Sequence, residues 1–243
     1  MAKRRKRARN VIVAQGWKSK ENIDTLCLSP VSYGPVRPFA RNRRERQGLD
    51  IPLDSMPMSR LTIHQVPCLR DNYAYLLHCP ETGATGALDP SEAEPVLKAA
   101  AGSGWRITHV LNTHHHWDHV GGNGGIKSAT GARVIGPEPD RNRIPELDET
   151  VAEGRPFRLG NAEATIFFIP GHTKGHMAFW FPESEALFCG DTLFTLGCGR
   201  LFEGTPEQMW TSLGKLRRLP GETNVYCGHE SVLHRAARLH ACA

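Results

Sequence analysis

The sequence predicts an α/β sandwich, with β-sheets inside and helices outside. Short apolar stretches rich in β-branched and aromatic residues recur between residues 61 and 226, bounded by Gly, Pro or polar residues as strands are. Many of these strands look antiparallel to their neighbours. Helix signals are inserted at intervals between them, and such elements pack in layers around a common core.

The ordered region is expected to begin at Arg60. Its first part predicts four strands and a helix. The turn-forming run from Pro80 to Gly83 separates the second and third strands. Ser91 can cap the helix, and Gly102 and Gly104 end it. The predicted elements are strands at 61–66, 73–78, 84–89 and 105–112, with the helix at about 92–102.

The second part predicts a short helix, a Pro-rich irregular link, and then strands around a longer helix. Pro206 suits the first position of that longer helix, and Thr205 is its expected cap. The predicted elements are a helix from about 122, a strand at 133–135, strands at 157–159, 164–169, 177–181 and 186–189, a helix at about 206–218 and a last strand at 224–226.

The most informative segment is Thr-His-His-His-Trp-Asp-His at residues 113–119. Imidazole and carboxylate are ligands for zinc, iron and manganese, and grouping them without a metal would be costly in an apolar fold. The segment follows a predicted strand and precedes a glycine-rich turn. Because alternate residues of an extended segment share a face, His114 and His116 are expected to point together and His115 away. The pattern suits two adjacent metal ions.

Further metal-type residues follow three other predicted strands. His172, Asp191 and His229 each come directly after a glycine that ends an apolar stretch. A lone histidine at a strand end is more often structural. Three repeats of the pattern beside a dense cluster favour a shared metal site.

The basic character of the chain lies in its first part. Residues 1–57 hold 13 Lys and Arg against 5 Asp and Glu, whereas the rest has 17 against 20. No nucleic-acid surface is expected for the body. The leader, residues 1–57, reads as a disordered tail, as sequence preceding a start at Met56 or Met58, or as a nucleic-acid or targeting arm.

Cysteine usage and hydropathy indicate a cytoplasmic protein. The seven cysteines are odd in number and form no Cys-Xaa-Xaa-Cys pair, which disfavours a disulfide framework. Cys198 is expected to be structural. No apolar run is long enough to cross a bilayer, and the charged start of the chain has no apolar stretch typical of a secretory signal, so neither such a signal nor a membrane partner is expected.

Five motifs resemble the metallo-β-lactamase superfamily and, within it, the hydroxyacylglutathione hydrolase (glyoxalase II) family. They are THHHWDH at 113–119, PGHT at 170–173, GDTLF at 190–194, GCGRLFEGT at 197–205 and YCGHE at 226–230. The resemblance covers about residues 60–230. It implies an αββα sandwich with two mixed sheets and outer helices, and a catalytic domain over 58–230.

The resemblance also implies a dinuclear metal site. His114, His116 and His172 would hold one ion, and Asp118, His119 and His229 the other, with Asp191 bridging both and no ligand role for His115. Two divalent ions are expected, zinc first, with iron or manganese as alternatives. Asp118 and Asp191 are the expected catalytic carboxylates.

The activity implied by the resemblance is hydrolysis of S-(2-hydroxyacyl)glutathione, such as S-D-lactoylglutathione, in methylglyoxal detoxification. A hydroxide shared by two metals would attack the thioester carbonyl, and thiolate would leave readily. Arg200 would face a glutathione carboxylate, and Phe202 stands where the family often has Tyr or Phe. A monomer is expected.

The resemblance stops at Ser231. Residues 231–243 replace the helical C-terminal region of the family, which a truncated or frameshifted gene model would explain. Weak or absent thioesterase activity is therefore expected. The alternatives are another hydrolase of the superfamily, such as a lactonase or β-lactamase, or a persulfide dioxygenase with one iron. A further alternative is a non-enzymatic remnant, or a nucleic-acid-binding protein that uses the basic leader.

Overall fold

The computed structural model describes residues 59–230, which contain every predicted site residue. The predicted leader at 1–57 and the atypical tail at 231–243 lie outside these residues, so the proposed division of the chain stays a prediction.

The first sheet has six strands in the order β1-β2-β3-β4-β5-β6. The first three are antiparallel, and β3 to β6 are parallel. The strands are β1 (Thr62–Cys68), β2 (Asn72–His78), β3 (Thr85–Leu88), β4 (His109–Leu111), β5 (Arg133–Pro137) and β6 (Glu149–Val151).

The second sheet has five strands in the order β13-β10-β9-β8-β7. All neighbours are antiparallel except β10 and β13, which are parallel. These strands are β7 (Phe157–Leu159), β8 (Ala162–Phe168), β9 (Met177–Phe181), β10 (Ala186–Gly190) and β13 (Asn224–Cys227); β11 (Leu193–Phe194) and β12 (Gly197–Cys198) form a small hairpin. Both large sheets are mixed, as expected.

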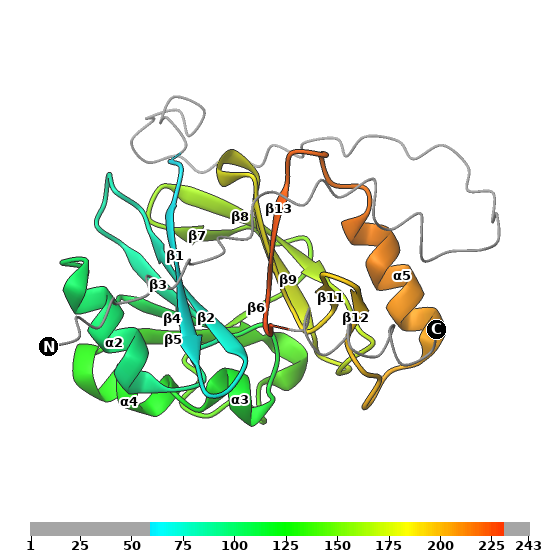
Figure 1. Ribbon diagram of the computed structural model, residues 1–243, viewed down its shortest axis with the longest axis horizontal. Helices are drawn as coiled ribbons and strands as arrows, with labels where there is room; N and C mark the ends of the chain where they lie inside the picture. Colours follow the sequence, from blue (N-terminus) through cyan, green and yellow to red (C-terminus); the bar gives the residue numbers. More distant parts are fainter. Residues whose placement is uncertain (1–58, 231–243) are drawn as a thin grey trace, which may run out of the picture.

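Helices cover the outer face of each sheet (Figure 1). The helices α2 (Ala93–Gly102) and α4 (Asn123–Thr130) pack on the first sheet, and α5 (Pro206–Leu216) packs on the second. A one-turn helix, α3 (Trp117–Val120), and two 3-10 turns, η3 (Glu138–Asp140) and η4 (Pro182–Ser184), complete the elements. The central core lies between the sheets and includes Leu77, Leu111, Phe179 and Phe188. The predicted αββα sandwich is confirmed.

Several local predictions were wrong. The N-cap of α2 is Glu92, and the Ser91 hydroxyl instead donates to the Asp118 carbonyl. Only His109–Leu111 of the expected 105–112 strand pairs in the sheet. The link after β5 contains η3 and β6. The antiparallel pairing expected for many strands holds for β1 to β3 and for β7 to β10. The β3–β4 pair is parallel because the α2 crossover joins these two strands.

The start of α5 was predicted correctly. Thr205 accepts a hydrogen bond from Gln208 N, the Gln208 side chain accepts one from Thr205 N, and Pro206 is the first helical residue. None of the helices within residues 59–230 is both long and apolar enough to span a membrane.

Candidate metal centre

The histidine-rich segment leaves β4 and enters α3, and neighbouring residues hold both of its ends. Asp89, which follows β3, accepts hydrogen bonds from the Thr113 amide (2.8 Å) and the Thr113 hydroxyl (2.7 Å). The Asn112 side chain donates to the His119 carbonyl (3.0 Å). Because these partners are buried, the segment is fixed where its side chains meet.

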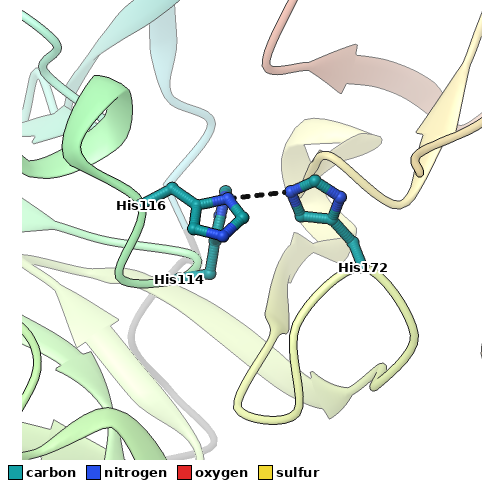
Figure 2. Close-up of side chains that lie close together, drawn as sticks. All are labelled: His114, His116 and His172. Atoms are coloured by element: carbon teal, nitrogen blue, oxygen red, sulfur yellow. Dashed lines mark hydrogen bonds between the residues drawn. The ribbon is translucent and has the colours of Figure 1, made fainter. Parts of the chain in front are cut away.

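His114, His116 and His172 form the first donor group. One ring nitrogen from each lies within 4.8 Å of the others. Figure 2 shows the three rings converging, with His116 Nδ1 and His172 Nε2 at hydrogen-bond distance (3.0 Å). His172 follows β8 of the second sheet, so this group joins the two sheets.

Asp118, His119 and His229 form the second donor group, whose ligand atoms also lie within 4.8 Å of one another. The Asn72 side-chain amide donates to Asp118 Oδ2 (3.1 Å) and to the Asp118 carbonyl (3.0 Å), which orients the carboxylate. His229 follows β13, and its Nε2 lies 3.4 Å from Asp118 Oδ2.

Asp191 lies between the two donor groups. Its Oδ2 is 3.4 Å from His172 Nε2 of the first group and 3.3 Å from His229 Nε2 of the second. Its Oδ1 is 3.4 Å from His119 Nε2. A carboxylate in this position can reach both groups at once. All seven predicted ligands therefore come together, although their role as ligands stays a prediction.

The donor atoms fit a pair of divalent cations. His114 Nε2, His119 Nε2 and Asp191 Oδ1 are buried and have no hydrogen-bond partner among the described residues. Buried polar atoms without partners are rare in proteins, and these three face the same space as the other donors. Imidazole and carboxylate donors, without thiolate in either group, suit zinc, iron or manganese.

The two donor groups differ in charge. Burial lowers the pKa of His114 well below its ordinary range and that of His116 to about 4. Burial opposes charge on His119 and His229 as well, but the neighbouring carboxylates outweigh it. Asp191 and Asp89 raise the pKa of His119, and Asp118 and Asp191 raise that of His229 to about 10. The second donor group thus attracts positive charge.

Asp89 and His176 are buried beside the site and were not singled out from the sequence. Asp89 Oδ2 accepts from His119 Nδ1 (3.2 Å), which directs His119 Nε2 into the site. Its position directly after an apolar strand was the available signal. His176 Nε2 accepts from the Asp191 amide (3.1 Å), and its ring stacks on His114 with centroids 4.5 Å apart. No spacing rule singles out His176.

The predicted substrate-binding residues lie beside the first donor group, in the segment from β12 to the start of α5, which we name loop 197–205. Phe202 is 63% exposed, and its ring packs edge-on against His116 and His172, with centroids 5.4 and 5.2 Å apart. Arg200 is exposed, and its carbonyl accepts from His172 Nδ1 (2.8 Å). His115 does point away from both donor groups, towards Asp140. Glutathione binding by Arg200 and Phe202 stays a prediction.

Comparison with protein families and curated proteins gives consistent matches. The model of the metallo-beta-lactamase superfamily matches residues 80–229. Hydroxyacylglutathione hydrolases from Methylococcus capsulatus and Rhodospirillum rubrum are each 61% identical to this chain, over 70% and 71% of its length. The matched region is 66% and 68% of those proteins, so the chain spans about two thirds of their length.

Several solved structures are similar to this chain in fold. ETHE1 from Myxococcus xanthus is 30% identical with a TM-score of 0.63, over 70% of this chain and 76% of its own. TTHA1623 in a di-iron-bound form is 29% identical with a TM-score of 0.59, over 70% and 92%. The BLEG-1 B3 metallo-beta-lactamase, at 23% identity and a TM-score of 0.65 over 70% and 92%, shares the fold.

Proposed function

Because the chain belongs to the hydroxyacylglutathione hydrolase family of the metallo-β-lactamase superfamily, we propose that it is a metal-dependent thioesterase acting on S-(2-hydroxyacyl)glutathione. The observation that carries the proposal is the position of Asp191 between two donor groups. A pair of sites sharing one carboxylate suits hydrolysis by two metals.

The proposed ligands divide as the donor groups do. The first donor group would hold one divalent ion, the second donor group the other, and Asp191 would reach both. Two such ions lower the pKa of water and polarise a carbonyl oxygen. Zinc is the proposed metal, because the ligands are imidazole and carboxylate and zinc accepts both. We propose that the protein is a monomer and lies in the cytoplasm.

The protein's own groups keep the two carboxylates ionised. Burial alone would raise the pKa of Asp118, but hydrogen bonding to His229 and the charge of His119 hold it well below its usual range. Burial would likewise raise the pKa of Asp191, but the charge of His119, followed by hydrogen bonding to His229, lowers it to about 2. Both side chains are therefore available to cations at neutral pH.

Loop 197–205 supplies the proposed substrate contacts. The exposed guanidinium of Arg200 can pair with a glutathione carboxylate in two parallel hydrogen bonds. The Phe202 ring forms an apolar surface beside the first donor group, where it can pack on the substrate near its reacting carbonyl. A thioester releases a thiolate, so neither residue has to donate a proton.

Metal analysis and hydrolysis of S-D-lactoylglutathione by the same preparation test the proposal. We expect two divalent ions per chain, and thioester hydrolysis that is lost after chelation and restored by zinc. One iron per chain with oxygen consumption on a persulfide would instead indicate a dioxygenase. Turnover of a β-lactam or lactone without turnover of the thioester would indicate another hydrolase of the superfamily.

A further inference from the structure

His115 cannot be a metal ligand, because both of its ring nitrogens have protein partners. The Asp140 carboxylate accepts from Nδ1 (3.0 Å), and the Arg143 guanidinium donates to Nε2. A carboxylate only accepts and a guanidinium only donates, so the ring carries its proton on Nδ1. This side chain lies within the metal-binding loop, where each of its neighbours is a proposed ligand.

The partners of His115 lead to loop 197–205. Arg143 makes a two-pronged contact with Glu203, in which Nη1 donates to Oε2 (3.1 Å) and Nη2 donates to Oε1. Arg143 Nη1 also lies 3.4 Å from Asp140 Oδ1. His115, Asp140, Arg143 and Glu203 thus form one connected set, which we name the His115 network.

The His115 network also reaches the segment that carries His172. Glu203 Oε2 accepts from the Lys174 amide (2.8 Å). The backbone at Gly175 packs directly on the Asp140 carboxylate, since a Cβ there would lie 2.4 Å from Oδ1. Three segments of the site therefore meet in one network: the metal-binding loop, the His172 segment and loop 197–205.

Burial separates this network from an ordinary surface ion pair. The side chain of Asp140 is 1% exposed and that of His115 is 12% exposed. Surface pairs contribute little because water competes for them, whereas a half-buried, two-pronged arginine–carboxylate contact also fixes geometry. Glu203 is followed in the chain by Gly204, whose amide is bonded to the Gly171 carbonyl (3.1 Å) beside His172.

We propose that His115 is a positioning residue that fixes loop 197–205 against the metal-binding loop through Asp140, Arg143 and Glu203. It sets where Arg200 and Phe202 stand relative to the two donor groups. The expected effect on substrate binding rests on the proposed thioesterase function. The expected effect on the ordering of loop 197–205 does not.

Two substitutions break the contact between His115 and Arg143, one from each side, and a third breaks it while a hydrogen bond to Asp140 remains. Arg143→Met keeps an apolar side chain and removes the guanidinium, and His115→Phe keeps the ring and removes both nitrogens. His115→Asn can still donate to Asp140 but cannot reach Arg143. The matched control is Arg158→Met, which breaks the exposed Arg158–Glu163 pair of the β7–β8 hairpin.

Amide hydrogen exchange of the full, metal-loaded chain is the primary measurement. The amides of Gly199, Phe202 and Gly204 are bonded to carbonyls outside the loop. In Arg143→Met and His115→Phe we expect them to exchange about tenfold faster, the low end of what charge-assisted hydrogen bonds contribute. His115→Asn should be intermediate, Arg158→Met unchanged, and two metal ions should remain in every variant.

Steady-state kinetics supply the second measurement. Arg143→Met and His115→Phe should raise KM for S-D-lactoylglutathione about tenfold, with kcat within about twofold. Unchanged exchange in both variants would overturn the proposal, as would metal loss in His115→Phe equal to that in His116→Phe. If the unsubstituted chain holds metal but hydrolyses no thioester, the proposed function fails, and the exchange data still decide the role of His115.

Discussion

His176 is buried and is not one of the proposed ligands, but it holds the backbone of the proposed ligand Asp191. Its Nδ1 faces the Met177 carbonyl (3.2 Å), so its Nε2 is free to accept from the Asp191 amide. Burial lowers the pKa of His176 to about 3, which keeps the ring neutral and Nε2 an acceptor at physiological pH. The backbone of Asp191 is thereby held in place between the donor groups.

Replacing His176 should weaken metal binding. His176→Phe keeps the ring stacked on His114 but leaves the Asp191 amide without an acceptor. We expect metal affinity to fall about 10–100-fold and the free energy of unfolding to fall by about 1–3 kcal/mol. Competition with a chromogenic chelator and urea unfolding measure the two effects.

The matched variant is His176→Gln, whose side-chain oxygen can accept the same hydrogen bond. It should recover most of the affinity lost in His176→Phe. Equal affinity in His176→Phe and the unsubstituted chain would show that the hydrogen bond to Asp191 has no part in metal binding.

At this scale the sequence predicted the residues that carry recognisable chemistry and missed those that act through the backbone. His114 and His116 converge because alternate positions share a face, as predicted. The position of Asp89 after β3 was a signal in the sequence, but the roles of Asp89 and His176 could not be predicted, because they depend on which amide or ring the fold places beside them.

At the scale of elements, the strand ends need glycine where they approach the site. Gly190 ends β10 at φ +47°, and a Cβ there would lie 2.4 Å from the Thr113 hydroxyl. A Cβ on Gly228, after β13, would lie 2.4 Å from Asp191 Oδ1 and 2.7 Å from His119 Cε1. The glycines that precede Asp191 and His229 in the sequence therefore admit the close approach of other segments.

Gly228→Ala should disturb the metal site directly. The added methyl has to displace Asp191 or His119, and overpacking of this kind costs about 1–3 kcal/mol. We expect fewer than two metal ions per chain after dialysis, together with a lower melting temperature. Gly221→Ala is the control, because a Cβ there meets nothing within 4 Å, and a change within about 0.5 kcal/mol is expected.

Loop 197–205 should depend on pH through Glu203. Hydrogen bonding to Arg143 lowers the pKa of Glu203 from its ordinary 4.5 to about 2. The contact therefore contributes fully above pH 4.5 and is lost as the pH falls towards 2. Since Arg143 is 41% exposed, the contribution should be only about 1 kcal/mol.

The measurement compares unfolding of the chain and of Glu203→Gln across this pH range, both with chelator so that metal loss is equal. The difference should be constant above pH 5 and should vanish near pH 2. A difference that does not change with pH would mean that the carboxylate charge of Glu203 is unimportant.

Elements with strong local signals were predicted well, and those fixed by tertiary contacts were not. The capping residues of α5 marked its start. In contrast, α3 is one turn long and β6 has three residues, so neither contains a full period of a hydrophobic pattern. Their structure follows from the loop anchored by Asp89 and from pairing with β5.

At the scale of the whole molecule, the proposed metal ions connect the two sheets. Four ligands follow β4 of the first sheet, and His172, Asp191 and His229 follow strands of the second. Bound metal should therefore stabilise the sandwich as a unit. At a free metal concentration a thousand times the dissociation constant, the gain is about 4 kcal/mol, or roughly 10 °C in melting temperature for a domain of this size.

Thermal unfolding with zinc and with chelator tests this expectation. Asp191→Asn should show a much smaller difference, because its side chain can no longer serve both donor groups. Equal melting temperatures with and without metal in the unsubstituted chain would contradict a bridge between the sheets.

The end of β13 is held by the first hairpin of the chain. The Tyr73 amide donates to the Gly228 carbonyl (2.8 Å), the Glu230 amide donates to the Asp71 carbonyl (2.7 Å), and Asn72 pairs with His229. During synthesis, His229 leaves the ribosome long after the other ligands, and it joins the site only when it reaches the β1–β2 turn. A nascent chain can thus assemble the first donor group early, but full metal loading has to await this late, long-range closure.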